Sequence, residues 1–177
     1  AVNFRGSTGL GHAYCRDISG DWSIGPDDTV AGVRHVLETY DWIDPSRVAG
    51  LGASYGGFSV NYLNGHAPEG MFRCLVNHDG VFDLRSAYWS TDELFFMEKE
   101  FNGPPCDAAA NDSDSPYNVA SPSLKVAEWR TPTLVIQGDK EKPELTDMIN
   151  STCAVDLAEL EGADATGADG CQEYKVV

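Results

Sequence analysis

The sequence predicts an α/β fold, with a mostly parallel sheet and helices on both faces of that sheet. Short apolar runs of strand length alternate with segments whose apolar residues have helical spacing. The short runs are apolar throughout, as is typical of parallel strands that are covered on both faces. With 177 residues, 42% of them hydrophobic and 23% charged, the chain has the size and composition of one globular domain.

The N-terminal part predicts a strand, a loop and a helix. Residues 1–4 form a short apolar run, and the glycine-rich stretch 6–11 follows it as a loop. Asp27 and Asp28 then stand at the expected start of a helix, where carboxylates are favourable. The apolar stripe of this helix consists of Val30, Val33, Val36, Leu37 and Tyr40.

The middle of the chain repeats the order of strand and helix. Residues 47–51 predict a strand, residues 54–63 a helix with apolar residues at helical spacing, and residues 72–76 a second strand. A long polar and aromatic segment follows, and within it we expect a helix over residues 88–101. The region is therefore organised as strand, sharp turn, helix and strand.

One more strand is predicted at Thr133–Ile136, because Pro132 and Gly138 punctuate its two ends. Beyond about residue 143 this alternation is lost, and residues 163–170 are small and acidic with little apolar content. We therefore divide the chain into a partial α/β domain over residues 1–142 and a divergent acidic tail with little order over residues 143–177.

Composition argues against several classes of partner. The formal net charge is −16, from 28 acidic and 12 basic residues, which disfavours nucleic acid and anionic membrane surfaces as partners. No apolar run approaches the roughly twenty residues that cross a bilayer. The five cysteines are widely spaced, so we expect neither a metal site nor a cofactor; they are Cys15, Cys74, Cys106, Cys153 and Cys171.

Two sequence triplets indicate where the protein is located. Asn111-Asp112-Ser113 and Asn150-Ser151-Thr152 fit the acceptor pattern for N-glycosylation, which occurs on secreted proteins. We therefore expect a secreted protein.

The run Gly52-Ala53-Ser54-Tyr55-Gly56 fits the Gly-x-Ser-x-Gly elbow of an α/β-hydrolase fold, in which Ser54 is the nucleophile. The required context is present, because a predicted strand precedes it and a predicted helix follows it. The backbone N–H of Tyr55, at the start of that helix, would be one oxyanion donor. The alternative is an ordinary glycine turn.

A serine nucleophile needs a general base, and the base needs an acid that orients it. On this fold the acid follows a later strand, and the strand at 133–136 leads to two candidates, Asp139 and Glu141. Solvated acids in a turn are the alternative interpretation. No histidine follows His78, so the expected base is absent; His78 follows a strand and is expected to be a structural histidine bonded to its turn.

Substrate contacts are expected just after the strands, at the edge where open α/β sheets bind ligands. Tyr55, Val81 and Phe82 occupy such positions, and their largely apolar side chains would favour a small or apolar substrate side chain next to the scissile bond. For Val81 and Phe82, packing in the core alone is an equally weighted alternative.

Four segments, in order and at the right spacing, resemble the catalytic domain of the prolyl oligopeptidase family. The likeness covers roughly residues 1–141. The segments are Asn3–Gly9, Gly50–Gly57, Asn77–Asp83 and Trp129–Ile136.

This resemblance implies a peptidase that removes dipeptides from the N-termini of short peptides, with a β-propeller on its N-terminal side. It also implies that earlier strands and a second oxyanion donor, a tyrosine side chain, lie outside this chain. The family's His-Gly-x-x-Asp motif corresponds to residues 137–141 and aligns Glu141 with the acid, two residues after Asp139. The chain is thus expected to be a fragment, inactive because the catalytic histidine is missing.

Two alternatives to the peptidase fragment are open. The elbow alone is equally compatible with a carboxylesterase or a lipase, although the segments 3–9 and 78–83 favour a peptidase. The placement of the histidines is also compatible with a catalytically inactive remnant that other molecules recognise, for example as an antigen or allergen.

Overall fold

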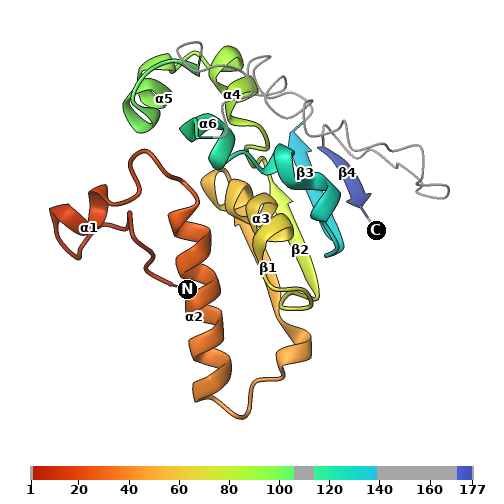
Figure 1. The fold of residues 1–177 in the computed structure, drawn as a ribbon. Helices are drawn as coiled ribbons and strands as arrows, with labels where there is room; N and C mark the ends of the chain where they lie inside the picture. Colours follow the sequence, from red (N-terminus) through yellow and green to blue (C-terminus); the bar gives the residue numbers. More distant parts are fainter. Residues whose placement is uncertain (1, 106–113, 139–170, 177) are drawn as a thin grey trace.

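The computed structural model describes residues 2–105, 114–138 and 171–176, and its centre is a four-stranded sheet (Figure 1). The strands are β1 (Ala49–Ala53), β2 (Cys74–His78), β3 (Thr133–Gly138) and β4 (Cys171–Val176), in the order β1-β2-β3-β4. The first three strands are parallel, and β4 pairs with β3 in the antiparallel direction. The parallel α/β architecture is therefore confirmed, whereas β4 lies in the tail for which the sequence predicts little order.

The strand register brings three strand ends together at one edge of the sheet. Ala53 at the end of β1 pairs with His78 at the end of β2, and His78 pairs with Ile136 of β3. The residues that follow these strands, including Ser54, consequently lie at the carboxyl edge of the sheet, where open α/β sheets bind ligands.

Helix α3 (Tyr55–His66) packs on one face of the sheet. Leu75 and Asn77 of β2 point to this face and are each 1% exposed. On the opposite face Leu51 of β1 is 74% exposed, so in the described part of the chain the helical cover is heavier on the α3 face. β1 is also the outer strand of this sheet.

The N-terminal segment differs from the predicted strand. Residues 2–4 form no strand, because their side chains pack on helices: Val2 lies against Gly32 of α2 (Ile24–Thr39), and the ring of Phe4 lies 5.7 Å from that of Tyr55. Helix α2 also begins earlier than the two carboxylates suggest, after Ser23. Asp28 accepts hydrogen bonds from the Arg5 backbone and guanidinium instead of marking the helix start.

The single helix expected over residues 88–101 is divided in two. Helix α4 (Leu84–Ser90) is capped by Asp83, whose side chain accepts a hydrogen bond from the Ser86 N–H, and α5 (Leu94–Phe101) follows it. Between them the hydroxyl of Thr91 accepts a hydrogen bond from the Glu93 N–H. Such a local bond competes with the helix and ends it.

Shorter elements complete the described structure (Figure 1). They are α1 (His12–Arg16), α6 (Pro116–Val119) and the 3-10 helices Pro45–Arg47 and Pro122–Glu128. The larger core cluster joins α3 to α4, α5 and α6 around Phe58, Leu84 and Tyr117, and a smaller cluster around Val60 and Leu75 lies between α3 and the sheet.

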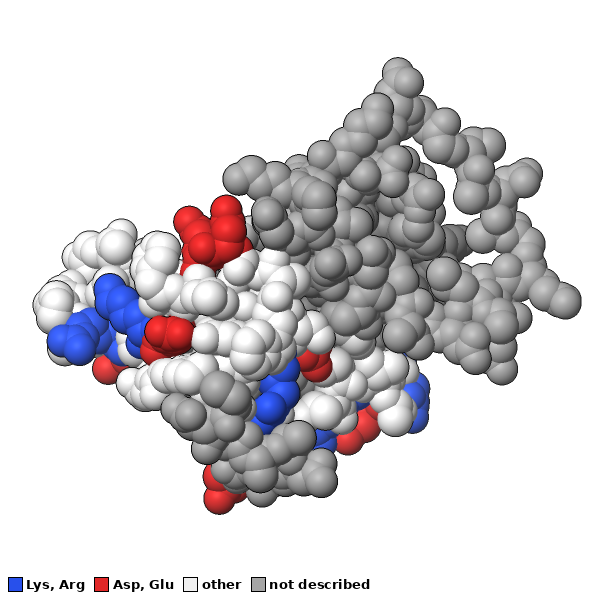
Figure 2. Space-filling model, turned by 90° about the horizontal axis from the view of Figure 1, so that it is seen from above, with Lys and Arg blue, Asp and Glu red and all other residues white. Residues whose placement is uncertain are grey.

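Acidic and basic side chains are interspersed with uncharged residues on the face of the molecule seen from above (Figure 2). Within the ranges that the structure describes, no helix combines the length and the apolar character that crossing a membrane requires.

Candidate active site

Ser54 lies at a sharp turn between β1 and α3. Its φ of 56° and ψ of −118° belong to a region that non-glycine residues rarely adopt, at a cost of about 1–3 kcal/mol. The turn is held by a hydrogen bond of 3.0 Å from the Ser54 N–H to the His78 carbonyl at the end of β2. The side chain of Ser54 is exposed at the carboxyl edge of the sheet. This is the geometry that the sequence predicts for a nucleophile elbow.

Glycines allow the strand and the helix to approach each other at this turn. A Cβ atom on Gly52 would overlap the backbone carbonyl of Gly56, and a Cβ on Gly57 would lie 2.5 Å from the Gly80 Cα. Because backbone atoms cannot move aside as a flexible side chain can, larger residues at these positions would displace the turn.

Two buried asparagines hold the turn from behind. The Asn77 Nδ2 donates to the Asn61 Oδ1 over 2.7 Å, and the Asn77 Oδ1 accepts from the Gly80 N–H over 3.0 Å. The Asn61 Nδ2 donates to the Val81 carbonyl over 3.2 Å. Both asparagines are 1% exposed, so these bonds satisfy amides that have no access to water.

Tyr55 is the first residue of α3, and within the described residues its backbone N–H donates no backbone hydrogen bond outside the helices and strands. A free N–H at the positive end of a helix dipole is the donor that an oxyanion requires. The phenol ring is partly buried, and its hydroxyl donates to the Trp22 carbonyl over 2.9 Å. Burial raises the pKa of Tyr55 well above its ordinary value, because it disfavours the charged phenolate.

A cavity of about 510 Å³ opens beside Ser54. Of the residues predicted to form the site, it brings together Ser54, Tyr55 and Val81. Phe82 lies elsewhere: it is 4% exposed and packs edge-on against Trp129, at a ring distance of 5.7 Å. The rest of the lining is mostly apolar, with three carboxylates, and consists of Phe4, Gly6, Ile18, Trp22, Asp79, Ala87, Thr91, Glu93, Phe96, Met97 and Glu100.

Asp79 is a site residue that the sequence analysis missed. It follows β2 directly and lines the same cavity as Ser54, and its backbone has a positive φ of 48°. Its carboxylate lies 3.0 Å from the Nε2 of His78, and its N–H donates to the Ile136 carbonyl. His78 is 53% exposed and does not line the cavity. The sequence signal was its position directly after a strand, which it shares with Ser54.

The two candidate acids, Asp139 and Glu141, lie outside the described residues. β3 ends at Gly138, immediately before Asp139, and it pairs with β2 next to the elbow. Because Asp139 and Glu141 are not described, the assignment of either one as the acid stays a prediction. In the described part of the chain, no cluster of three or more histidine, cysteine or acidic side chains could hold a metal ion.

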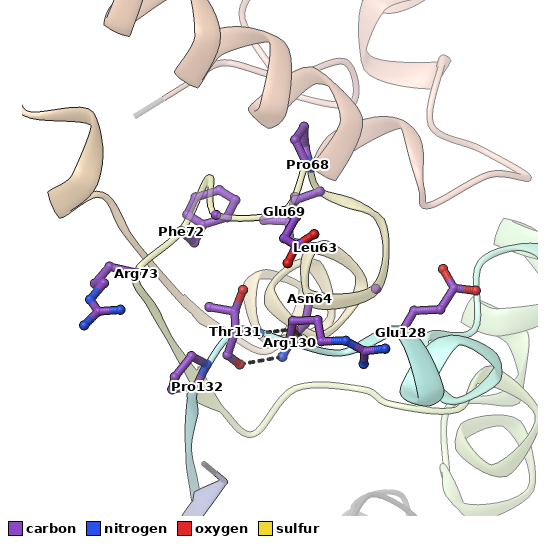
Figure 3. Close-up of a pocket in the computed structure, with 13 residues that line it drawn as sticks. Leu63, Asn64, Pro68, Glu69, Phe72, Arg73, Glu128, Arg130, Thr131 and Pro132 are labelled. Atoms are coloured by element: carbon purple, nitrogen blue, oxygen red, sulfur yellow. Dashed lines mark hydrogen bonds between the residues drawn. The ribbon is translucent and has the colours of Figure 1, made fainter.

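A second cavity, of about 470 Å³, lies at the opposite ends of β2 and β3 (Figure 3). Arg73 and Pro132, which precede these strands, are among its lining residues. The buried Asn64 fixes this region, because its Oδ1 accepts from the Arg130 and Thr131 N–H groups over 3.1 and 3.0 Å. The cavity is thus separated from Ser54 by the length of the strands.

Sequence comparison places the chain among known proteins. Residues 1–142 match the model of the prolyl oligopeptidase family. The chain is 42% identical over 140 residues to dipeptidyl-peptidase 5 of Trichophyton equinum, covering 78% of this chain and 19% of that protein. It is 40% identical over 144 residues to dipeptidyl-peptidase 5 of Aspergillus fumigatus, covering 80% of this chain and 19% of that protein. The chain thus spans about a fifth of the length of these relatives.

Solved structures share the fold. The acylaminoacyl peptidase of Pyrococcus horikoshii superposes with a TM-score of 0.68 at 22% identity, covering 77% of this chain and 21% of that one. Dipeptidyl peptidase 4 of Porphyromonas gingivalis gives a TM-score of 0.64 at 16% identity, covering 85% of this chain and 21% of that one. At these identities the likeness shows a common α/β-hydrolase fold.

Proposed function

Because this chain belongs to the prolyl oligopeptidase family, we propose that it is the nucleophile-bearing segment of a longer, secreted serine peptidase that releases dipeptides from peptide N-termini. The observation that carries the proposal is the strained turn at Ser54, which opens on a cavity next to an unpaired helix N-terminal N–H. The curated relatives of similar sequence bear the name dipeptidyl-peptidase 5, which supports the substrate class.

The proposed reaction is acyl transfer through Ser54. Its Oγ attacks the carbonyl carbon of the scissile peptide bond while a general base takes the hydroxyl proton. The Tyr55 N–H binds the oxyanion of the tetrahedral intermediate, and the dipole of α3 adds to its stabilisation. The C–N bond then breaks, the base returns its proton to the leaving amine, and water hydrolyses the acyl-enzyme to release the dipeptide.

The base is the part of this reaction that the 177 residues do not supply in the usual place, because no histidine follows His78. We propose that the base, a second oxyanion donor and a substrate-restricting β-propeller belong to other parts of the longer protein. Asp139 or Glu141 would orient the base. On this view the isolated chain has the nucleophile and does not turn over peptides.

Hydrolysis of a dipeptidyl p-nitroanilide tests the proposal in the full-length protein. Ser54→Ala should lower the rate by several orders of magnitude, since the loss of a triad member has an effect of that size. Glu38 is exposed on α2 and lines neither of the two cavities, so Glu38→Gln offers a control of normal activity. Retention of most activity in Ser54→Ala would refute the assignment of the nucleophile.

The same substrate and a fluorophosphonate probe test the isolated chain, again with Ser54→Ala as the control. We expect no turnover above that control. Turnover that disappears in Ser54→Ala would contradict this expectation, and His78 would then be the first residue to examine as the base, since it is exposed beside Asp79.

A further inference from the structure

The side chain of Tyr55 connects the elbow to a distant part of the chain. Its hydroxyl donates to the Trp22 carbonyl over 2.9 Å, a bond between residues that are 33 positions apart. Trp22 lies immediately before Ser23, the residue that precedes α2. The bond therefore ties the first residue of α3 to the start of α2.

Three aromatic rings hold the phenol in this position. The ring of Trp22 is edge-on to Tyr55, with centroids 5.3 Å apart and planes at 82°, and those of Phe58 and Phe4 lie at 5.5 and 5.7 Å. Phe4, Trp22 and Tyr55 also line the cavity beside Ser54. The tyrosine is therefore fixed by packing on its faces and by a directed hydrogen bond at its tip.

Gly25 provides the space for this hydroxyl. A Cβ atom at Gly25 would overlap the Tyr55 hydroxyl oxygen and would lie 3.0 Å from the ring of Phe4. A side chain at this position would consequently compete with the hydroxyl for the same volume, next to the Trp22 carbonyl.

We propose that the hydrogen bond from the Tyr55 hydroxyl to the Trp22 carbonyl positions the Tyr55 N–H for the oxyanion. Gly25 leaves the space that this hydroxyl occupies. Through its side chain, Tyr55 is then a positioning residue. This inference rests on the proposed function, and it adds a role for the side chain to that of the backbone N–H. The oxyanion donor and the hydroxyl belong to one residue, so a rotation of that residue moves both. Loss of the bond leaves the donor less well aimed at the developing charge.

Amide hydrogen exchange in the full-length protein, resolved by mass spectrometry of short overlapping peptides, tests the bond directly. Ser54 and Phe58 are the reporters, because their N–H groups bond to the His78 and Ser54 carbonyls within the elbow. Tyr55→Phe should accelerate exchange at both amides about three- to tenfold, the range expected for one net hydrogen bond.

Tyr117→Phe is the matched control. It removes a hydroxyl that also donates to a backbone carbonyl, that of Gly103, over 2.9 Å, in the same core but away from the elbow. We expect a similar loss of thermal stability and unchanged exchange at Ser54 and Phe58. Wild-type exchange at these amides in Tyr55→Phe, or equal acceleration in both variants, would overturn the proposal.

Kinetics of the full-length protein provide the functional readout. Tyr55→Phe should lower kcat about three- to tenfold and change KM less than twofold, because the oxyanion forms only in the transition state. Gly25→Ala should lower kcat at least as much. The double variant Gly25→Ala/Tyr55→Phe should be more thermally stable than Gly25→Ala alone, and its kcat should not exceed that of Tyr55→Phe. A wild-type kcat in Tyr55→Phe would overturn the positioning role, whereas an active Ser54→Ala would refute the proposed function and leave the exchange result standing.

Discussion

Asn77→Ala is the substitution for which the structure predicts the clearest effect on stability. The side chain of Asn77 makes two hydrogen bonds behind the elbow, one to the Asn61 Oδ1 and one from the Gly80 N–H. Alanine makes neither, and the site is closed to water because Asn77 and Asn61 are each 1% exposed. Two polar groups, the Asn61 Oδ1 and the Gly80 N–H, would be left buried without these partners.

The magnitude follows from these two groups. A buried donor or acceptor without a partner costs about 1–3 kcal/mol, so we expect a decrease of about 2–6 kcal/mol in the free energy of unfolding. Single substitutions that cost more than about 4 kcal/mol are exceptional. Asn77→Ala should therefore be among the most damaging polar substitutions in this chain.

Urea unfolding, followed by tryptophan fluorescence and by far-ultraviolet circular dichroism, measures this change. Asn3→Ala removes an exposed asparagine side chain and should change the free energy of unfolding by less than about 0.5 kcal/mol. A loss below about 1 kcal/mol in Asn77→Ala would refute the reasoning, since it would mean that water reaches the site or that the network is not formed.

Three further outcomes are expected. Gly52→Ala should prevent the elbow from forming, and Ser54 should lose its reaction with a fluorophosphonate in the full-length protein, because the new methyl meets backbone atoms. Phe82→Ala should lower stability by about 3–5 kcal/mol, as for other buried aromatic residues, and should leave the ranking of substrate side chains unchanged in a substrate panel. Hydrogen bonds from Arg5 lower the pKa of Asp28 in the folded state. The ionised Asp28 therefore stabilises the fold above about pH 4, and this stabilisation is lost as the pH falls through the lowered pKa. In an acid titration of the free energy of unfolding, Asp28→Asn should reduce the dependence on pH in this range.

The elbow was predictable from the sequence because its determinants are local. A strand, a glycine, Ser54, two further glycines and a helix occur within the eighteen residues from Ala49 to His66, and each has the conformation that its position indicates. The three parallel strands were predictable for the same reason, since β1, β2 and β3 are apolar runs between turn residues. Each of these strands ends two residues later than predicted, and β1 and β2 also begin two residues later.

The part of the Ser54 cavity that Trp22 and Met97 line was not predictable in this way. Trp22 and Met97 reach it from segments that are separate in the sequence, through the packing of α2 and α5 against α3. The division between α4 and α5 depended on one threonine hydroxyl, whose competition with the helix is a weak local signal. Phe82 differs from Val81 because the side chains of neighbouring residues point in different directions, and only the fold determines which of them faces the cavity.

The contacts that set the geometry of Ser54 have a consequence for folding during synthesis. Its turn is held by Gly52, Gly57, Asn61, Asn77 and Gly80, all of which lie within thirty residues of one another. Contacts of short sequence separation form fast, and domains form from the N-terminal side as the ribosome releases the chain. The turn that carries Ser54, the proposed nucleophile, can thus be complete before the candidate acids Asp139 and Glu141 leave the ribosome. On the proposed function, Ser54 then reaches its strained conformation while the candidate acids that would orient the base are still unreleased, so the nascent chain holds a serine with little hydrolytic power.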